Sequence, residues 1–101
     1  MDEHMKFSDY LANNLSDENE AKAFLDAAIL EYEEDHDSEA FMLAIRTLAD
    51  AQGGISQLAI RTNLNRQNLY KILTGKTAPK FDTVDTILQA LGFRLSVMPI
   101  A

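Results

Sequence analysis

The stretch SQLAIRTNLNRQNLYKILTGK, residues 56–76, has the pattern of two short helices joined by a tight turn. Ala59 places a small side chain where a second helix crosses the first closely. Asn63, four residues later, suits the turn because asparagine tolerates a positive φ better than most residues. Leu69 and Ile72 then supply the apolar pair that the second helix buries against the first. These offsets occur together, and they predict a helix-turn-helix.

The chain on both sides of this motif also has helical spacing. One apolar stripe follows Ser16, and a second helix starts after Asp37 or Ser38, either of which can cap it. Asp82 is the predicted N-cap of a last helix, which Gly92 ends. We therefore predict an all-α fold apart from the C-terminus. The predicted helices cover about 16–35, 38–52, 56–62, 66–74 and 82–91, preceded by a short turn at 8–15.

The C-terminal residues 93–101 have the period of a strand. Apolar side chains alternate with other types from Phe93 to Met98, and Pro99 ends the pattern. Because the chain offers no second strand, we expect this one to pair outside the chain, most simply with its copy in a dimer. The side chains assigned to dimerisation are Phe93, Leu95 and Val97.

Charge is distributed unevenly along the chain, whose net charge is −7. Residues 1–50 hold 14 acidic and 3 basic side chains, whereas residues 51–101 hold 2 acidic and 6 basic ones. The second half therefore suits a polyanion, and the acidic half suits a cation-rich protein or water alone. For the acidic half, the simpler interpretation is a solvated helical face.

Residue types that carry chemistry are scarce. The chain contains no cysteine, and its two histidines, His4 and His36, lack the i, i+4 spacing of a helical zinc pair. We therefore expect a binding protein with no enzymatic activity, no cofactor and no metal site. No apolar run approaches the roughly 18 residues that cross a bilayer. Because the start also lacks the regions of a signal peptide, we expect a cytoplasmic protein without a membrane partner.

The second helix of the motif has an outer face suited to reading DNA. With Leu69, Ile72 and Leu73 turned inward, its polar side chains are left on the outer and N-terminal surface. Arginine can bond guanine O6 and N7 together, and glutamine or asparagine can do the same for adenine N6 and N7. A recognition helix places its N-terminal turns against base edges. The predicted base-reading residues are Arg66, Gln67, Asn68 and Lys71.

A further set of side chains around this helix suits the phosphate backbone of DNA. Among them, Tyr70 either stacks on a sugar–phosphate or simply covers the helix. One module this small contacts too few phosphates and bases for high affinity. We therefore expect a two-fold dimer on half-sites about one helical turn apart. The alternative is a solvated amphipathic helix that binds no DNA. The predicted phosphate contacts are Ser56, Arg61, Tyr70, Lys76 and Lys80.

Three segments carry a family resemblance: FMLAIRTLADAQGGISQLA (41–59), LNRQNLYKILTGKTAPKFDTV (64–84) and ALGFRLSV (90–97). The region from about Asp37 to Val97 resembles the lambda-repressor-like, Cro/C1-type helix-turn-helix domain. Nearly the whole chain is similar to the addiction-module antidote proteins, the antitoxins of HigA type. Asn63 stands where that family more often has glycine.

The resemblance implies a dimeric repressor of its own operon that also neutralises a small, basic, ribosome-dependent ribonuclease toxin of the RelE-like superfamily. Together with the charge pattern and the C-terminal alternation, it divides the chain into an acidic helical extension at 1–36, a Cro/C1-type DNA-binding domain at 37–92 and a candidate dimerisation strand at 93–101. Charge complementarity makes the acidic extension a candidate docking face for such a toxin. The residues assigned to this face are Glu31, Glu33, Glu34 and Asp35.

Two alternatives stay open at this point. One is a stand-alone, prophage-type transcriptional repressor that has no toxin partner. The other is a helical protein-interaction module whose basic helix binds an acidic protein. A DNA titration separates the interaction module from the two repressors, and a small toxin-like reading frame beside the gene separates the antitoxin from the stand-alone repressor.

Overall fold

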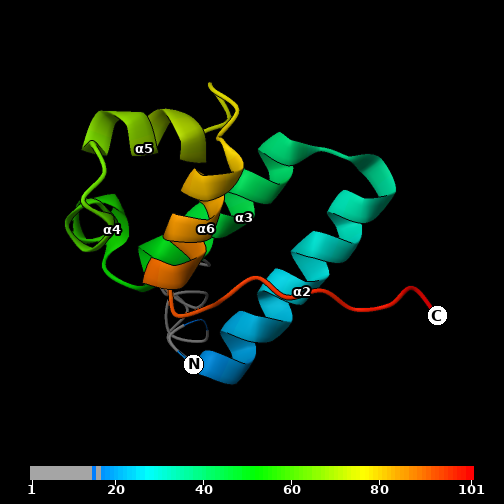
Figure 1. Cartoon of the computed structure of the whole chain (residues 1–101). Coiled ribbons are helices and arrows are strands. Elements are labelled where there is room, and N and C mark those ends of the chain that lie inside the picture. The colour runs from blue at the N-terminus through cyan, green and yellow to red at the C-terminus, as the bar shows by residue number, and fades with distance from the viewer. Residues whose placement is uncertain (1–14, 16) are drawn as a thin grey trace, which may run out of the picture.

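The computed structural model describes residues 15 and 17–101. Within that part the chain forms five helices and no strand, which confirms the predicted helical class for the described residues. Figure 1 shows α2 on one side of α3 and the pair α4 and α5 on the other side. In chain order the helices are α2 (Glu18–Asp35), α3 (Ser38–Ala51), α4 (Gly54–Thr62), α5 (Arg66–Leu73) and α6 (Phe81–Ala90).

Aspartate side chains cap the first two of these helices. The Asp17 carboxylate accepts hydrogen bonds from the backbone N–H groups of Asn19, at 2.8 Å, and Glu20, at 3.2 Å. The Asp37 carboxylate accepts one from the backbone N–H of Ala40 at 3.0 Å. These three bonds satisfy donors that the first turn of a helix leaves without partners. The start of α3 agrees with the prediction, and α2 begins slightly later than predicted.

α4 and α5 are two short helices joined by a tight turn, as the sequence predicts. Asn63 ends α4 with a φ of 58°, the left-handed conformation that an asparagine tolerates. Asn65 is the N-cap of α5, where its side chain accepts a hydrogen bond from the backbone N–H of Asn68 at 3.1 Å. The Thr62 hydroxyl donates to the carbonyl oxygen of Leu58 at 2.7 Å. Side chains of the turn residues therefore hold the turn.

The start of α6 differs from the prediction. Asp82 lies inside the first turn, and the helix begins at Phe81 after Lys80 as the N-cap residue. The Lys80 side chain makes no capping hydrogen bond, because an ammonium group cannot accept one. Asp82 still favours the helix through the macrodipole. The predicted cap is wrong because a first-turn aspartate and a capping aspartate give the same signal in the sequence.

One hydrophobic core joins the five helices. α3 packs against α2, α4 and α5, while α6 packs against α4. The apolar stripe of α2 contributes Ala21 and Leu25 to the core, and Leu15, just before that helix, is 4% exposed. The rest of the turn predicted at 8–15 lies outside the described residues. The six largest fully buried side chains are Ile45, Leu48, Leu58, Leu69, Leu73 and Ile87.

The tail, residues 93–101, has no regular secondary structure in this single chain, so the predicted strand is not confirmed. Phe93 packs against the core, whereas Val97 and Ile100 are 95% and 99% exposed. In the view of Figure 1 the tail leaves the end of α6 and passes in front of α2. A strand needs a neighbour to pair its backbone groups, and the described residues of one chain supply none.

Candidate nucleic-acid interface

The outer face of α5 presents polar side chains to solvent. Its inner face is closed by Leu69 and Leu73, both fully buried in the core. The other side chains of the first turn face outward, and this is the part of a recognition helix that is directed at base edges. The four residues predicted to read bases, all exposed, are Arg66, Gln67, Asn68 and Lys71.

A hydrogen bond links two predicted site residues across the turn. The Nε atom of Arg66 donates to the hydroxyl oxygen of Ser56 on α4 at 2.9 Å. The terminal nitrogens Nη1 and Nη2 have no hydrogen-bond partner among the described residues and can therefore donate to an outside acceptor. The sequence assigned Arg66 to bases and Ser56 to phosphate separately, and the structure places them in one contact. The bond orients the guanidinium before any ligand arrives, which lowers the entropy lost on binding.

Tyr70, on the same helix, lies beside two cationic groups. Arg46 of α3 has its guanidinium carbon 5.6 Å from the centre of the Tyr70 ring, and Lys76 has its ammonium nitrogen 5.5 Å from the same centre. Both distances are within the range of cation–π attraction. The sequence analysis missed Arg46, because only the packing of α3 against α5 brings it here. The available signal was that Arg46 is the one lysine or arginine between Lys22 and Arg61.

A surface hollow of about 290 Å³ lies along this face of α5. Four of its six lining residues belong to α5, and Ile55 of α4 supplies an apolar portion. Three of the lining side chains are cationic, so the hollow suits an anionic ligand that also offers a flat or apolar surface. The lining residues are Ile55, Arg66, Gln67, Tyr70, Lys71 and Lys76.

The remaining two predicted phosphate contacts are placed differently. The Arg61 guanidinium donates three hydrogen bonds within the protein, two to oxygens of Gln52 and one to the carbonyl oxygen of Ala90. This arginine therefore has a structural role that the sequence did not reveal. Lys80 is exposed at the start of α6 and does not line the hollow.

The acidic residues predicted for protein docking lie on α2, which packs against α3 and against no other described helix. Glu31, Glu33 and Glu34 are exposed, as is Asp35, whose carboxylate accepts a hydrogen bond from the backbone N–H of Asp37 at 2.9 Å. Figure 1 shows α2 and α5 separated by α3. The acidic and basic surfaces are therefore distinct in space as well as in sequence.

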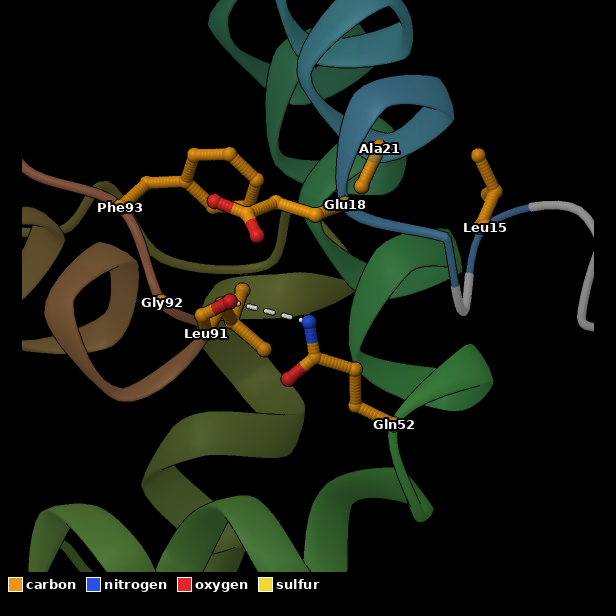
Figure 2. Close-up of a pocket in the computed structure, with 7 residues that line it drawn as sticks. All are labelled: Leu15, Glu18, Ala21, Gln52, Leu91, Gly92 and Phe93. Carbon is orange, nitrogen blue, oxygen red and sulfur yellow. Dashed lines mark hydrogen bonds between the residues drawn. The ribbon is translucent and has the colours of Figure 1, made fainter.

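A second hollow, of about 280 Å³, lies where the tail begins (Figure 2). Its wall includes Phe93, Glu18 and Gln52, and the Nε2 atom of Gln52 donates to the carbonyl oxygen of Leu91 at 2.9 Å. Glu18 is the one titratable side chain in the lining, so this hollow lacks the paired groups that acid–base catalysis uses. The other lining residues are Leu15, Ala21 and Gly92.

Residues 15 and 17–101 contain no cluster of three or more histidine, aspartate or glutamate side chains arranged to hold a metal ion. In the same part of the chain, no helix combines the length and the apolar character needed to cross a membrane.

Comparison with known proteins gives one family and one relative. A family model described as "Probable addiction module antidote protein" matches residues 3–99. An uncharacterized protein of Haemophilus influenzae is 31% identical over 97 residues, which cover 96% of this chain and 94% of that protein. No solved structure matches the chain significantly.

Proposed function

Because this chain belongs to the family of probable addiction module antidote proteins, we propose that it is the antitoxin of a toxin–antitoxin module, of HigA type. In this proposal it represses its own operon by binding operator DNA as a dimer, and it neutralises a small, basic, RelE-like ribonuclease toxin. The family match supports the antitoxin role. The remaining parts of the proposal rest on the surfaces described above.

The observation that carries the DNA-binding part is the exposed N-terminal face of α5. Three polar side chains able to bond base edges follow a helix–turn–helix junction whose turn residue, Asn63, has the required positive φ. Arg66 is already oriented by Ser56 at 2.9 Å. This arrangement suits a Cro/C1-type domain that places α5 in the major groove, with base edges facing Arg66 and Gln67.

The toxin-binding part of the proposal uses the outer face of α2. Leu30 is 63% exposed there, and Glu33 and Glu34, three and four residues later, lie on the same side of the helix. An apolar side chain beside carboxylates fits a basic protein that also offers an apolar contact.

Dimerisation is proposed to use the tail. Leu95 is 40% exposed and Val97 is 95% exposed, while Phe93 packs against the core and anchors the start of the tail. Pairing of two tails would satisfy their backbone groups and cover these apolar side chains. The dimer would also bring two α5 helices to one DNA site, which doubles the number of phosphate contacts.

A DNA titration tests this function. We expect the protein to bind duplexes from upstream of its own gene more tightly than scrambled duplexes of the same length, as measured by fluorescence anisotropy. Arg66→Ala and Gln67→Ala should each reduce the preference by roughly 1–3 kcal/mol, because each removes a bidentate base contact. Lys22→Ala on α2 is the matched control and should leave the preference intact. Equal binding of both duplexes by the unaltered protein would argue for an interaction module.

A pull-down of the tagged protein from its native cells at moderate salt tests the toxin part. We expect a small basic protein to remain bound in stoichiometric amount, identified by its mass. If operator DNA is bound but no such protein is retained from cells that express the neighbouring genes, the protein is a stand-alone repressor.

A further inference from the structure

Tyr70 joins two cations that are far apart in the sequence. The Arg46 guanidinium carbon and the Lys76 ammonium nitrogen lie 5.6 and 5.5 Å from the centre of its ring. Arg46 belongs to α3, and Lys76 follows the end of α5, so the ring connects two separate parts of the fold. The attraction of each cation to the ring holds two positive charges near one place on the surface.

Neither cation is neutralised by a carboxylate among the described residues. The ion pair found within 4.0 Å in that part of the chain joins Lys22 and Asp26 on α2. The Glu39 side chain lies against Gly75, directly before Lys76 in the sequence, yet it forms no ion pair with that lysine. Two cations beside one ring, with no carboxylate partner in the described part of the chain, produce a local positive potential that favours an anion.

The position of this cluster relative to the proposed base-reading residues limits what the anion can be. Tyr70 and Lys76 line the same hollow as Arg66 and Gln67, and Arg46 adds a charge from the side of α3. A ligand that reaches all of these groups must carry negative charge next to groups that offer flat hydrogen-bonding edges. Duplex DNA has that combination, because each base edge is flanked by backbone phosphates.

We propose that Arg46, Tyr70 and Lys76 form a phosphate-binding site that receives one phosphodiester group of duplex DNA. Arg46 and Lys76 donate to its oxygens, and the Tyr70 ring sets the distance between the two cations. Arg46 thereby extends the DNA-binding surface from α5 to α3. The inference rests on the proposed DNA-binding function, and it adds a contact that sequence analysis did not predict.

The test is the salt dependence of DNA binding. Binding of the full-length protein to one duplex from upstream of its gene is measured at several salt concentrations, for the unaltered chain and for Arg46→Gln. Each phosphate contact contributes roughly 0.9 to the slope of log K against log salt. We therefore expect Arg46→Gln to flatten the slope by about one unit per bound protomer and to weaken all DNA sequences by a similar factor.

Two further variants separate the site from general effects of charge and stability. Lys22→Gln removes a positive charge from α2, which does not pack against α5, and should leave the slope unchanged. Tyr70→Phe keeps an aromatic ring and should preserve most of the slope of log K against log salt. Tyr70→Leu should flatten that slope, because the ring that attracts both cations is then absent. Thermal unfolding of each variant checks that it is folded at the temperature at which DNA binding is measured.

The outcomes distinguish this inference from the function on which it rests. If the unaltered chain binds no DNA, the proposed function fails and the inference fails with it. If the unaltered chain binds with a salt slope that Arg46→Gln does not change, the phosphate site is wrong while the function stands. Inorganic phosphate is the second probe: saturable shifts of the Tyr70 ring signals by phosphate, together with an unchanged DNA slope in Arg46→Gln, would assign the site to a free anion and overturn the inference.

Discussion

The guanidinium of Arg61 on α4 donates hydrogen bonds to both oxygens of Gln52, at 3.1 Å to the side-chain Oε1 and at 3.2 Å to the main-chain carbonyl. The same guanidinium reaches the carbonyl oxygen of Ala90 at 3.1 Å, and Gln52 itself donates to that of Leu91 at 2.9 Å. The last carbonyl groups of a helix have no partner within the helix. One arginine therefore closes the ends of α3 and α6 and joins them to α4.

Arg61→Ala should lower the free energy of unfolding by roughly 1–2 kcal/mol, because three charge-assisted hydrogen bonds are lost while water reaches the freed carbonyls. Urea unfolding followed by circular dichroism measures this change. Arg61→Lys should recover only part of the loss, since an ammonium group cannot reproduce the fork geometry of a guanidinium. A variant as stable as the unaltered chain would show that the network contributes nothing to stability.

The turn between α4 and α5 should depend on the residue at position 63. Asn63 has a φ of 58°, and an alanine there pays the steric cost of a left-handed conformation, about 1 kcal/mol. Glycine has no such cost, so Asn63→Gly should be at least as stable as the unaltered chain. The comparison of the two variants by thermal unfolding tests the conformation itself. An equal loss of stability in Asn63→Ala and Asn63→Gly would instead show that the asparagine side chain stabilises the turn.

Gly75, in the turn after α5, should tolerate no larger residue. Its φ is 79°, and a Cβ atom there would collide with the side chain of Glu39 on α3. We expect Gly75→Ala to cost roughly 1–3 kcal/mol of stability, from strain and overpacking together. In a double-mutant cycle, adding Glu39→Ala to Gly75→Ala should restore the stability that the collision removes. The stability lost to the left-handed φ of residue 75 should remain lost. Strict additivity of the two changes would contradict the contact.

The acidic face of α2 should control affinity for the toxin. Reversing Glu33 and Glu34 to lysine should weaken toxin binding and reduce its dependence on salt, because a complementary pair of surfaces becomes repulsive. Isothermal titration at two salt concentrations measures both effects. The matched control reverses Glu18 and Glu20, at the other end of α2, to lysine, which changes the net charge by the same amount. Unchanged affinity and salt dependence in the Glu33 and Glu34 variant would rule out this face as the docking surface.

Much of the local structure follows from short-range patterns. The two helices around Asn63, the capping role of Asn65 and the burial of Leu69 are all present in the structure as predicted. The cap of α3 is Asp37, one of the two residues that the sequence offered for it. Capping and helical spacing depend on residues a few positions apart, so a single sequence contains the necessary information. Where one residue suits two positions of a helix, as Asp82 does at the start of α6, that information is insufficient.

The strand predicted for the tail shows a different limit. Alternation of apolar residues predicts an extended segment, but a strand forms only when another segment pairs with its backbone. Within one chain, Phe93 instead packs against the core and Val97 stays exposed. The alternation describes a tendency of these residues, and its outcome depends on a partner.

By itself, the sequence determined the helical class, the turn at Asn63 and the polar set carried by α5. Only the tertiary structure decided that Arg46 lies beside Tyr70, that Arg66 is held by Ser56, and that Arg61 joins three helices. The physical reason is the range of the interactions. Periodicity and caps act within a turn or two of one helix, whereas these contacts arise from how helices pack on a shared core, which no local pattern specifies.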